Sequence, residues 1–344
     1  MSAADGNRVR RVLVPVLTAA LCASLALAGC DRRRVEVAAG AKPSPATQPS
    51  TAAPAPSTVL DPQLGQGPHP VAGKVMLGAY LDFLHMSQAQ AVTMRRQQLG
   101  RSFRILQYYY QWTDNLPTSL PSVTGDTDAL LSWRGTSYTA ILDGSQDTLI
   151  ARQADRLARY GKPVFLRWAW EMNGSWYVWG GAKNGNNPAN FVKAWQHIHD
   201  IFQAHHATNV AWVWGPNWYS LPNAPWNDMR NYYPGDRYVD WVALSGYGDS
   251  RLTPDGIYGS FYNTWAGHKP IMIAETGVLD RGGTTKPDWI DALVVWLKAH
   301  PGVASIVWYD TDHSPGTAEN FRLDSTPASL AAFRRLAGDP YFSG

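Results

Sequence analysis

Short apolar runs recur along the chain from Lys74 onward and alternate with stretches of helical periodicity. Continuous apolar runs are typical of buried parallel strands, so this alternation predicts a parallel sheet covered by helices. The eight runs that we assign to strands are Val75–Leu81, Phe103–Tyr109, Ala129–Trp133, Val164–Trp170, Val210–Trp214, Val239–Ser245, Ile271–Ala274 and Ser305–Tyr309.

Five of the intervals between these strands carry helix signals. A capping box at Ser87–Gln90 and a terminal Gly100 mark the first helix. The stretch Asp147–Tyr160 presents its apolar residues on one face and predicts a second. Prolines suited to a first helical turn open the other three, at Pro188, Pro287 and Pro327.

Eight strands with interleaved helices predict an α/β fold, a (β/α)8 TIM barrel, as one folded domain at residues 73–344. The active site of such a barrel lies at the carboxyl ends of its strands. The intervals 113–128 and 217–238 read as loops, which are often functional at that face. A doubly wound open sheet is the alternative. It usually has a glycine-rich first turn, and none follows the first predicted strand.

The amino terminus has the pattern of a secretory signal. Three arginines, at positions 8, 10 and 11, precede the apolar segment Val12–Leu27, which is too short to span a bilayer comfortably. The residues Leu27–Cys30 resemble the lipobox of bacterial lipoproteins, whose cysteine receives a diacylglyceryl group. We therefore expect a signal peptide at residues 1–29 and a lipid anchor at Cys30, which would hold the protein outside the cytoplasm on a bacterial membrane. An ordinary secretory signal that contains a cysteine is the alternative.

Residues 30–72 are rich in Pro, Ala, Ser and Thr and poor in large apolar residues, so we expect a disordered tether. The only cysteine besides Cys30 is Cys22, inside the predicted signal, and no intramolecular disulfide is expected. Residues 1–29 hold three arginines and one aspartate, so the remainder carries 27 basic and 26 acidic residues. Because the positive and negative charges nearly cancel, we expect no binding of nucleic acid. We also expect a monomer.

One carboxylate stands at the end of the fourth predicted strand. Residues 164–180 read V-F-L-R-W-A-W-E-M-N-G-S-W-Y-V-W-G, in which Glu171 follows an apolar run and precedes several aromatic residues. Burial raises the pKa of a carboxyl group, which suits a proton donor near neutral pH. Aromatic faces beside it suit the apolar faces of sugar rings. The alternative is a loop acid in a Trp-rich core.

A second carboxylate, Glu275, ends the apolar strand K-P-I-M-I-A-E-T-G. Alone it could equally form a salt bridge or a helix cap. Because strand ends of one barrel face converge, Glu171 and Glu275 are expected to face each other. Glycoside hydrolysis needs two carboxyl groups: one protonates the leaving oxygen, and the other attacks the anomeric carbon or activates water. Retention of configuration requires a separation of about 5–5.5 Å, and inversion about 6.5–9.5 Å.

The stretch R-W-A-W-E-M-N-G-S-W-Y-V-W-G resembles the acid/base signature of glycoside hydrolase family 26, the β-mannanase family of retaining barrel enzymes, and I-A-E-T-G resembles its nucleophile strand. Further motifs follow the family's pattern between Val75 and Tyr341: A-W-V-W-G-P-N-W, Y-Y-P-G-D-R-Y-V-D-W-V-A-L-S-G-Y, S-I-V-W-Y-D and F-R-L-D-S-T-P. The resemblance implies that Glu171 is the acid/base and Glu275 the nucleophile.

The same resemblance implies roles for three aromatic residues. Tyr247 matches a tyrosine that hydrogen-bonds the nucleophile, Trp308 an aromatic near the cleavage site, and Trp176 one that lines the sugar cleft. Independently, Arg167 on the strand before Glu171 is expected to keep Glu275 ionised through charge pairing. A strand-end salt bridge is the alternative for Arg167.

Trp170 departs from the family, which commonly has His immediately before the acid/base. An imidazole both donates and accepts hydrogen bonds, whereas an indole only donates and occupies more volume. Hydrolysis remains the expectation, because both carboxylates are present. The choice of sugar is left open by this change: we expect β-1,4-mannan, with β-1,3-1,4-glucan and β-1,3-xylan as alternatives.

Other residues near the predicted strand ends are candidates for binding substrate. Trp112, Asn173, Trp179 and Trp218 could contact sugars, although packing in the core explains such tryptophans equally well. The histidines lack the spacing of zinc ligands together with an acid, so neither a metal nor an organic cofactor is expected.

The sequence therefore predicts a lipid-anchored, retaining endo-β-glycanase that acts on a polysaccharide. A surface glycan-binding lipoprotein on a degenerate barrel is the alternative from another functional class. A purely structural lipoprotein is a third possibility, but it would leave the tryptophans at the strand ends without a purpose.

Overall fold

The computed structural model describes residues 66–249, 251–313 and 320–344, where eight parallel strands close into a barrel in chain order. Each strand pairs with the next, and β8 pairs with β1. The strands are β1 (Met76–Asp82), β2 (Ile105–Tyr110), β3 (Asp128–Trp133), β4 (Val164–Trp168), β5 (Val210–Trp214), β6 (Trp241–Ser245), β7 (Ile271–Thr276) and β8 (Val303–Thr311). The predicted TIM barrel is confirmed, and the open-sheet alternative is wrong.

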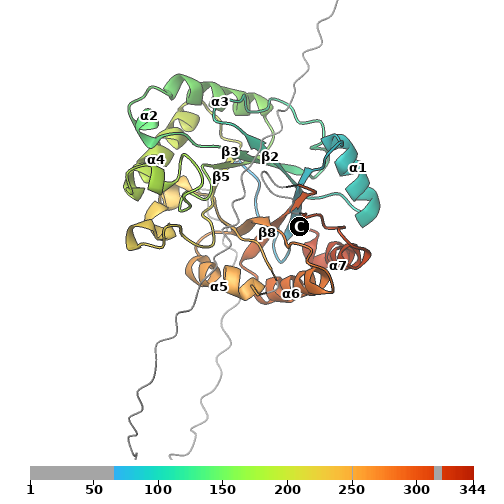
Figure 1. Cartoon of the computed structure of the whole chain (residues 1–344). Helices are drawn as coiled ribbons and strands as arrows, with labels where there is room; N and C mark the ends of the chain where they lie inside the picture. Colours follow the sequence, from blue (N-terminus) through green and yellow to red (C-terminus); the bar gives the residue numbers. More distant parts are fainter. Residues whose placement is uncertain (1–65, 250, 314–319) are drawn as a thin grey trace, which may run out of the picture. The chain divides into compact units, whose positions relative to one another are not determined.

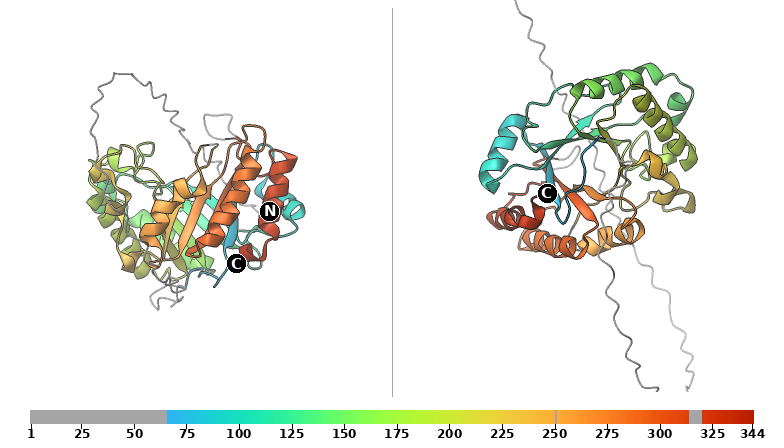
Figure 2. Two further views of the ribbon diagram at one scale, coloured as in Figure 1. Left: turned by 90° about the horizontal axis from the view of Figure 1, so that it is seen from below. Right: turned by 180° about the vertical axis from the view of Figure 1, so that it is seen from behind.

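Helices surround the barrel, as Figures 1 and 2 show. In the described ranges they are α1 (Gln88–Leu99), α2 (Tyr138–Leu142), α3 (Asp147–Tyr160), α4 (Pro188–Ala204), α5 (Pro254–Trp265), α6 (Thr285–Ala299) and α7 (Pro327–Gly338). The five predicted helices are α1, α3, α4, α6 and α7. The capping box at Ser87 is present, and Gly100 ends α1 in the left-handed conformation with a φ of 71°.

Two helices, α2 and α5, are absent from the sequence prediction. The short α2 has no side-chain cap. The longer α5 has the signal used elsewhere, because Thr253 caps it and Pro254 lies in its first turn. Gly256 and Gly259 lie inside this helix, and the low helix propensity of glycine hides the pattern.

Alternate residues of each strand fill the interior of the barrel. An apolar inner cluster consists of Met76, Ile105, Leu130, Phe165, Ala211, Val213, Trp241, Ala243, Met272, Ala274, Ala304 and Val307. Because side chains alternate along a strand, residues at even steps toward the carboxyl end point the same way. By this rule Tyr80, Tyr109, Arg167, Ser245 and Tyr309 project inward above the inner cluster.

Residues 66–68, which the sequence prediction assigned to the tether, contact the barrel. Gly67 and Pro68 are buried, and the indole N–H of Trp241 donates to the carbonyl oxygen of Pro68 at 3.1 Å. A Cβ added to Gly67 would lie 2.4 Å from the backbone nitrogen of Ala211. These contacts attach Gln66, Gly67 and Pro68 to the barrel, ahead of the predicted start of the domain at residue 73. The physical reason is that a buried indole N–H requires an acceptor.

Three predictions concern residues outside the described ranges: the signal peptide at 1–29, the lipid anchor at Cys30, and the tether as far as residue 65. They stay predictions. Of the helices in the described ranges, none combines the length and the apolar character that crossing a bilayer demands.

Candidate active site

Glu171 and Glu275 lie at the carboxyl ends of two strands, just after β4 and within β7. Both are nearly inaccessible to solvent, with exposed fractions of 6% and 3%. The charge of Glu275 raises the pKa of Glu171, so the two side chains share one electrostatic environment. The structure therefore brings together the two acids that the sequence singled out.

A bulge in β7 directs Glu275 into the barrel. Leu244 of β6 pairs with Ile273, but the next residue, Ser245, pairs with Glu275, so Ala274 is an extra residue on β7. Without it, Glu275 would share the outward face of Ile273, because side chains alternate along a strand. Bulges commonly re-aim side chains next to active sites. Here the bulge places Glu275 opposite the inward-facing Ser245.

The backbone after β4 adopts a strained conformation. Ala169 and Glu171 have φ values of 46° and 54°, in the left-handed region that side chains other than glycine rarely occupy. Each such residue costs on the order of 1–3 kcal/mol. The backbone N–H of Glu171 still donates to the carbonyl oxygen of Gly215 at 2.9 Å. Glu171 is thus fixed to the end of β5.

Arg167 projects from β4 into the barrel and is fully buried. Its Nη1 lies 2.5 Å from Oε1 of Glu275, and its Nη2 donates to Ser245 Oγ. The predicted pairing with Glu275 is present. Gly215 makes room for the guanidinium, since a Cβ there would lie 2.9 Å from Nε of Arg167. A buried charge needs such partners, because an uncompensated one is strongly unfavourable.

Tyrosines complete the surroundings of Glu275. The hydroxyl of Tyr247 donates to Oε2 of Glu275 at 2.8 Å, as the family resemblance implied. Burial, and then the charge of Glu275, raises the pKa of Tyr247, Tyr109 and Tyr309. These phenols therefore stay protonated near neutral pH. With Arg167 on one oxygen and Tyr247 on the other, both carboxylate oxygens of Glu275 are occupied.

The surroundings of Glu171 are different. Burial, and then repulsion by Glu275, raises its pKa to about 7, although Arg167 and hydrogen bonds from Trp176 and Ser245 oppose the shift. The indole N–H of Trp176 donates to Oε2 of Glu171 at 2.7 Å. The carboxyl group therefore carries a proton over much of the range below neutral pH.

Trp170 is buried beneath this site. Its ring lies 5.2 Å from that of Tyr109 and 5.4 Å from that of Tyr177, and the guanidinium carbon of Arg167 lies 5.6 Å from its ring centre. Because none of the Trp170 side chain is exposed, any influence on a substrate passes through these neighbours.

Some of the candidate sugar platforms are open to solvent. Trp176 and Trp218 are partly exposed, and both pack against Tyr219, with ring centroids 5.9 Å and 5.1 Å apart. Trp176 lies over Gly174, where a Cβ would approach the indole to 2.3 Å. Trp176, Trp218 and Tyr219 form an aromatic surface beside Glu171, which we call the aromatic side of the site.

Four other candidates are packed in the interior, and the structure does not support direct sugar contacts for them. Trp112 stacks on Trp133 and donates to Gln146, and Trp179 stacks on Tyr177 and donates to the carbonyl of Trp170. Trp308 faces Trp289 of α6 and Phe333 of α7. Asn173 bonds to backbone atoms of Asn217 and Tyr219 and thereby holds the loop after β5. The physical reason is burial: these side chains have exposed fractions of at most 8%.

The sequence prediction missed several residues that surround the acids, namely Tyr80, Tyr109, Ser245 and Tyr309. One signal could have found them. Each lies two or four residues beyond an inward apolar residue on its strand, as Tyr309 lies beyond Val307. Counting residues in this way does not predict the direction of Glu275, because the bulge in β7 interrupts the alternation of inward and outward side chains.

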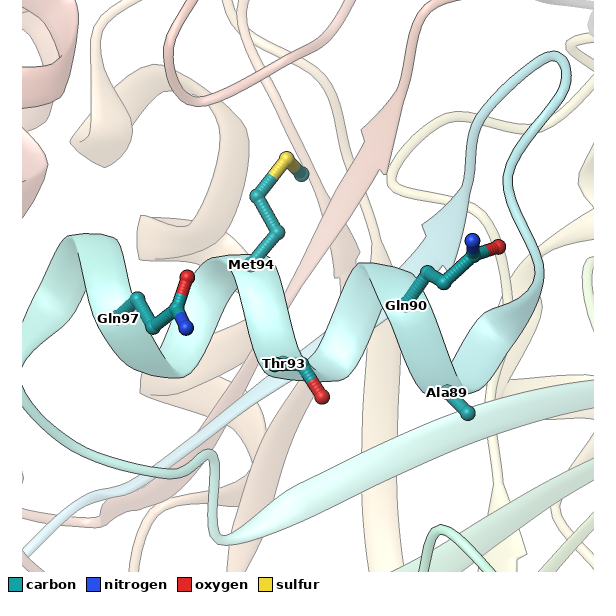
Figure 3. Close-up of a pocket in the computed structure, with 5 residues that line it drawn as sticks. All are labelled: Ala89, Gln90, Thr93, Met94 and Gln97. Carbon is teal, nitrogen blue, oxygen red and sulfur yellow. The ribbon is translucent and has the colours of Figure 1, made fainter.

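A shallow hollow lies on α1, away from the two acids. It is lined by Ala89, Gln90, Thr93, Met94 and Gln97, whose side chains Figure 3 shows along one side of the helix. None of these side chains is ionisable, so the hollow offers no acid–base chemistry. In the described ranges, no three His, Cys, Asp or Glu side chains converge as metal ligands.

Known proteins match much of the barrel. Endoglucanase H of Acetivibrio thermocellus is 30% identical over 257 residues, 70% of this chain and 28% of that protein. Mannan endo-1,4-beta-mannosidase A and B of Caldalkalibacillus mannanilyticus is 31% identical over 174 residues, 48% of this chain and 30% of that protein. Beta-1,3-xylanase TXYA of a Vibrio species is 31% identical over 131 residues, 38% of this chain and 26% of that protein. The chain spans less than a third of the length of these relatives.

Solved structures share the fold. A GH26 β-mannanase from Bacteroides ovatus superposes with a TM-score of 0.59 at 15% identity, over 78% of this chain and 90% of that one. A Bacillus subtilis mannanase gives a TM-score of 0.54 at 23% identity, over 75% and 84% of the two chains. At these identities the likeness concerns the fold alone.

The sequence model of glycosyl hydrolase family 26 matches residues 111–319, a range that contains both Glu171 and Glu275. This match covers more than half of the chain, and the relative that is 30% identical covers 70% of it. The chain therefore belongs to glycosyl hydrolase family 26.

Proposed function

We propose that this chain is a retaining endo-β-glycanase, with Glu171 as the acid/base and Glu275 as the nucleophile. One observation carries the proposal: two neighbouring buried carboxyl groups have opposite surroundings. Glu275 is paired with Arg167 at 2.5 Å, whereas burial raises the pKa of Glu171 to about 7. A buried acid with a raised pKa beside a carboxylate that is held by a cation suits the two roles of glycoside hydrolysis.

In the first step Glu275 attacks the anomeric carbon while the bond to the leaving oxygen breaks. The indole of Trp176 donates to Oε2 of Glu171, which leaves Oε1 to carry the proton that passes to that oxygen. Arg167 and Tyr247 hold the two oxygens of Glu275 and thereby fix its orientation. The product of this step is a glycosyl ester on Glu275.

In the second step a water molecule attacks the anomeric carbon, and the ester bond to Glu275 breaks. Glu171, now ionised, accepts the proton of the water and returns to its initial state. The two displacements together retain the configuration of the anomeric carbon.

The first candidate substrate is β-1,4-mannan, because the signatures around Glu171 and Glu275 resemble those of the β-mannanases. Mixed-linkage β-glucan is the second candidate, supported by the match to an endoglucanase over 70% of this chain. Trp170 leaves the choice among these sugars open, since it removes the polar group that the family commonly has beside the acid. β-1,3-Xylan is a third candidate, through a shorter match.

A reducing-sugar assay across mannan, lichenan and β-1,3-xylan tests the activity and ranks these substrates. We expect turnover of at least one polymer by the wild type, and turnover at least about 100-fold slower by Glu171→Gln and Glu275→Gln. Binding without turnover in all three proteins would contradict hydrolysis and favour a glycan-binding role.

We also propose that the enzyme is a monomer, lipid-anchored at Cys30 outside the cytoplasm. The Leu27–Cys30 motif supports the anchor. Mass spectrometry of the protein purified from membranes of a bacterial host would detect a diacylglyceryl group on Cys30. A mature amino terminus lacking Cys30, or an unmodified Cys30, would contradict the anchor.

A further inference from the structure

A buried phenylalanine beyond β8 packs against the tyrosine that bonds the nucleophile. The ring of Phe321 lies 5.1 Å from that of Tyr247 and 5.8 Å from that of Tyr309, measured between ring centroids. The exposed fraction of Phe321 is 1%, so a substrate in the mouth of the barrel does not reach it. Phe321 can therefore influence the reaction only through its neighbours.

The hydroxyl of Tyr247 depends on such neighbours for its position. Tyr247 lies two residues beyond the end of β6 and is only half-buried. Among the described residues, two aromatic rings contact its own, those of Phe321 and Tyr309. A side chain keeps one rotamer only where its surroundings exclude the others. The contact with Phe321 thus helps to hold the Tyr247 hydroxyl at its 2.8 Å hydrogen bond to Glu275.

The ends of β7 and β8 confine Phe321 closely. Its backbone N–H donates to the carbonyl oxygen of Thr311 at 2.9 Å, and its carbonyl oxygen accepts the indole N–H of Trp308 at 3.0 Å. Gly277, just after β7, makes room for the ring, since a Cβ there would lie 2.9 Å from Cδ1 of Phe321. The ring therefore has little freedom to move away from Tyr247.

Buried ion pairs hold the residues that follow Phe321. Asp310 of β8 bonds to the fully buried Arg95 of α1, at 2.6 Å from Nε to Oδ2 and 2.9 Å from Nη2 to Oδ1. Oδ1 of Asp310 also accepts the backbone N–H of Leu323 at 3.1 Å. Nη1 of Arg95 lies 2.7 Å from Oδ2 of Asp324. Residues 323 and 324 are thus attached to α1 and β8.

A second buried cation holds the same segment from α6. Lys286 has an exposed fraction of 1%, and its Nζ donates to the carbonyl oxygen of Arg322. Burial lowers the pKa of Lys286 to about 8, and the charges of Asp310, Asp280 and Asp324 oppose this shift. Displacing the segment would leave buried charges uncompensated, which is strongly unfavourable. We call these groups the buried ionic cluster: Arg95, Lys286, Asp310 and Asp324.

We propose that Phe321 is a positioning residue that holds the hydroxyl of Tyr247 against Glu275, and that the buried ionic cluster fixes Phe321 in turn. This inference rests on the proposed function. Glu275 must meet the anomeric carbon in one orientation, and a misplacement of about 1 Å can cost on the order of 10²-fold in rate. The packing beyond β8 therefore contributes to catalysis without touching the substrate.

The test is a double-mutant cycle on the polysaccharide that the wild type hydrolyses, with Phe321→Leu and Tyr247→Phe made singly and together. Tyr247→Phe removes a hydrogen bond to a charged group, so we expect kcat to fall about 10- to 100-fold. Phe321→Leu should lower kcat about 10-fold and leave KM within about twofold, because it displaces a catalytic contact and no substrate contact. In the Tyr247→Phe background the same change should lower kcat by less than about twofold, because the hydroxyl that Phe321 positions is already absent.

Asp324→Asn tests the buried ionic cluster and also serves if Phe321→Leu does not fold. It removes one charge and leaves the pair of Arg95 with Asp310 in place. We expect kcat to fall about threefold, and again by less than about twofold when Tyr247→Phe is present.

Two matched controls separate positioning from stability. Phe202→Leu alters a fully buried ring on α4 that packs against Trp212, and Asp291→Asn removes an exposed pair with Arg335. Phe202→Leu should lower the midpoint of denaturant unfolding about as much as Phe321→Leu does, and both controls should keep the kcat of the wild type.

Three results would overturn the inference. With an active wild type, unchanged kcat in Phe321→Leu and Asp324→Asn would exclude the positioning role and leave the proposed function intact. Equal losses with and without the Tyr247 hydroxyl would also exclude it, because they would indicate a general disturbance of the fold. A coupled loss in Phe321→Leu but none in Asp324→Asn would exclude the part assigned to the buried ionic cluster. A wild type without turnover on any polysaccharide would instead overturn the proposed function itself.

Discussion

The ends of β4 and β7 begin from the same local design, an apolar strand that delivers a glutamate to the rim, yet they prepare the two carboxyl groups for opposite tasks. At β4 the chain enters the left-handed region, and Glu171 meets aromatic residues and little compensating charge. At β7 a bulge turns Glu275 onto a cation and a phenol. The difference comes from Arg167. Its side chain extends from β4 and pairs with Glu275 of β7 on the other side of the barrel.

The comparison shows that the role of an acid is set by neighbours distant in the sequence. A single guanidinium stabilises the charge of Glu275 and lies near enough to Glu171 to lower its pKa, but burial and Glu275 itself outweigh it there. The following predictions test this division, from the largest expected effect to the smallest.

Removing either carboxylate should abolish most of the activity, but in different ways. We expect Glu275→Gln to lose on the order of 10⁴-fold in kcat on every substrate, because no covalent step remains. Glu171→Gln should lose about 10²–10⁴-fold on polysaccharide, and much less on an aryl glycoside whose leaving group needs no proton. Steady-state kinetics with both substrate types would measure this. An equal loss for the two variants on the aryl glycoside would contradict the assignment of roles.

Removing the shared cation should damage the β7 end most. Arg167→Met leaves Glu275 buried without its partner, and we expect the free energy of unfolding to fall by about 3–5 kcal/mol. Denaturant titration at pH 7 would measure this. The matched control is Arg104→Met, whose pair with Asp128 is partly exposed and should cost under about 1 kcal/mol. Similar losses of unfolding free energy in the two variants would show that the buried Arg167–Glu275 pair stabilises the fold no more than a partly exposed pair does.

Crowding the cation should have a smaller effect. In Gly215→Ala the new Cβ would lie 2.9 Å from Nε of Arg167, so the guanidinium must shift away from its position against Glu275. We expect a loss of about 1–3 kcal/mol in stability, together with reduced kcat. Gly338→Ala at the end of α7 is the control, because no atom lies near its added Cβ. Unchanged kinetics in Gly215→Ala would argue that the position of Arg167 does not matter.

The smallest expected effect is a shift in pH dependence. Glu171 must be protonated for the first step, so kcat/KM should fall as pH rises through its pKa of about 7. The indole of Trp176 favours the ionised form and lowers that pKa. Trp176→Phe should therefore move the alkaline limb upward, by up to about one pH unit. Trp218→Phe, which keeps the hydrogen bond of Trp176, should leave the limb in place, and a downward shift in Trp176→Phe would contradict the account.

The sequence predicts the barrel, the two acids and the pairing of Arg167 with Glu275, because apolar runs and charged strand ends are local signals. It does not predict which tryptophans are open to a sugar. Trp176 and Trp179 lie three residues apart in one aromatic stretch, yet Trp176 is partly exposed and Trp179 is buried, because the packing of helices and loops differs around them. The inward tyrosines follow from strand alternation once the register is known, whereas the bulge that reorients Glu275 has no mark in the sequence.

The central claim is that Glu275 forms a covalent bond to the sugar, which Glu171 then helps to hydrolyse. The most direct test is mass spectrometry of Glu171→Ala after rapid quenching with an aryl β-glycoside that has a good leaving group. We expect a mass increase of one glycosyl unit, located by peptide mapping on Glu275. An adduct on another residue, or the absence of any adduct with products of inverted anomeric configuration, would contradict the account.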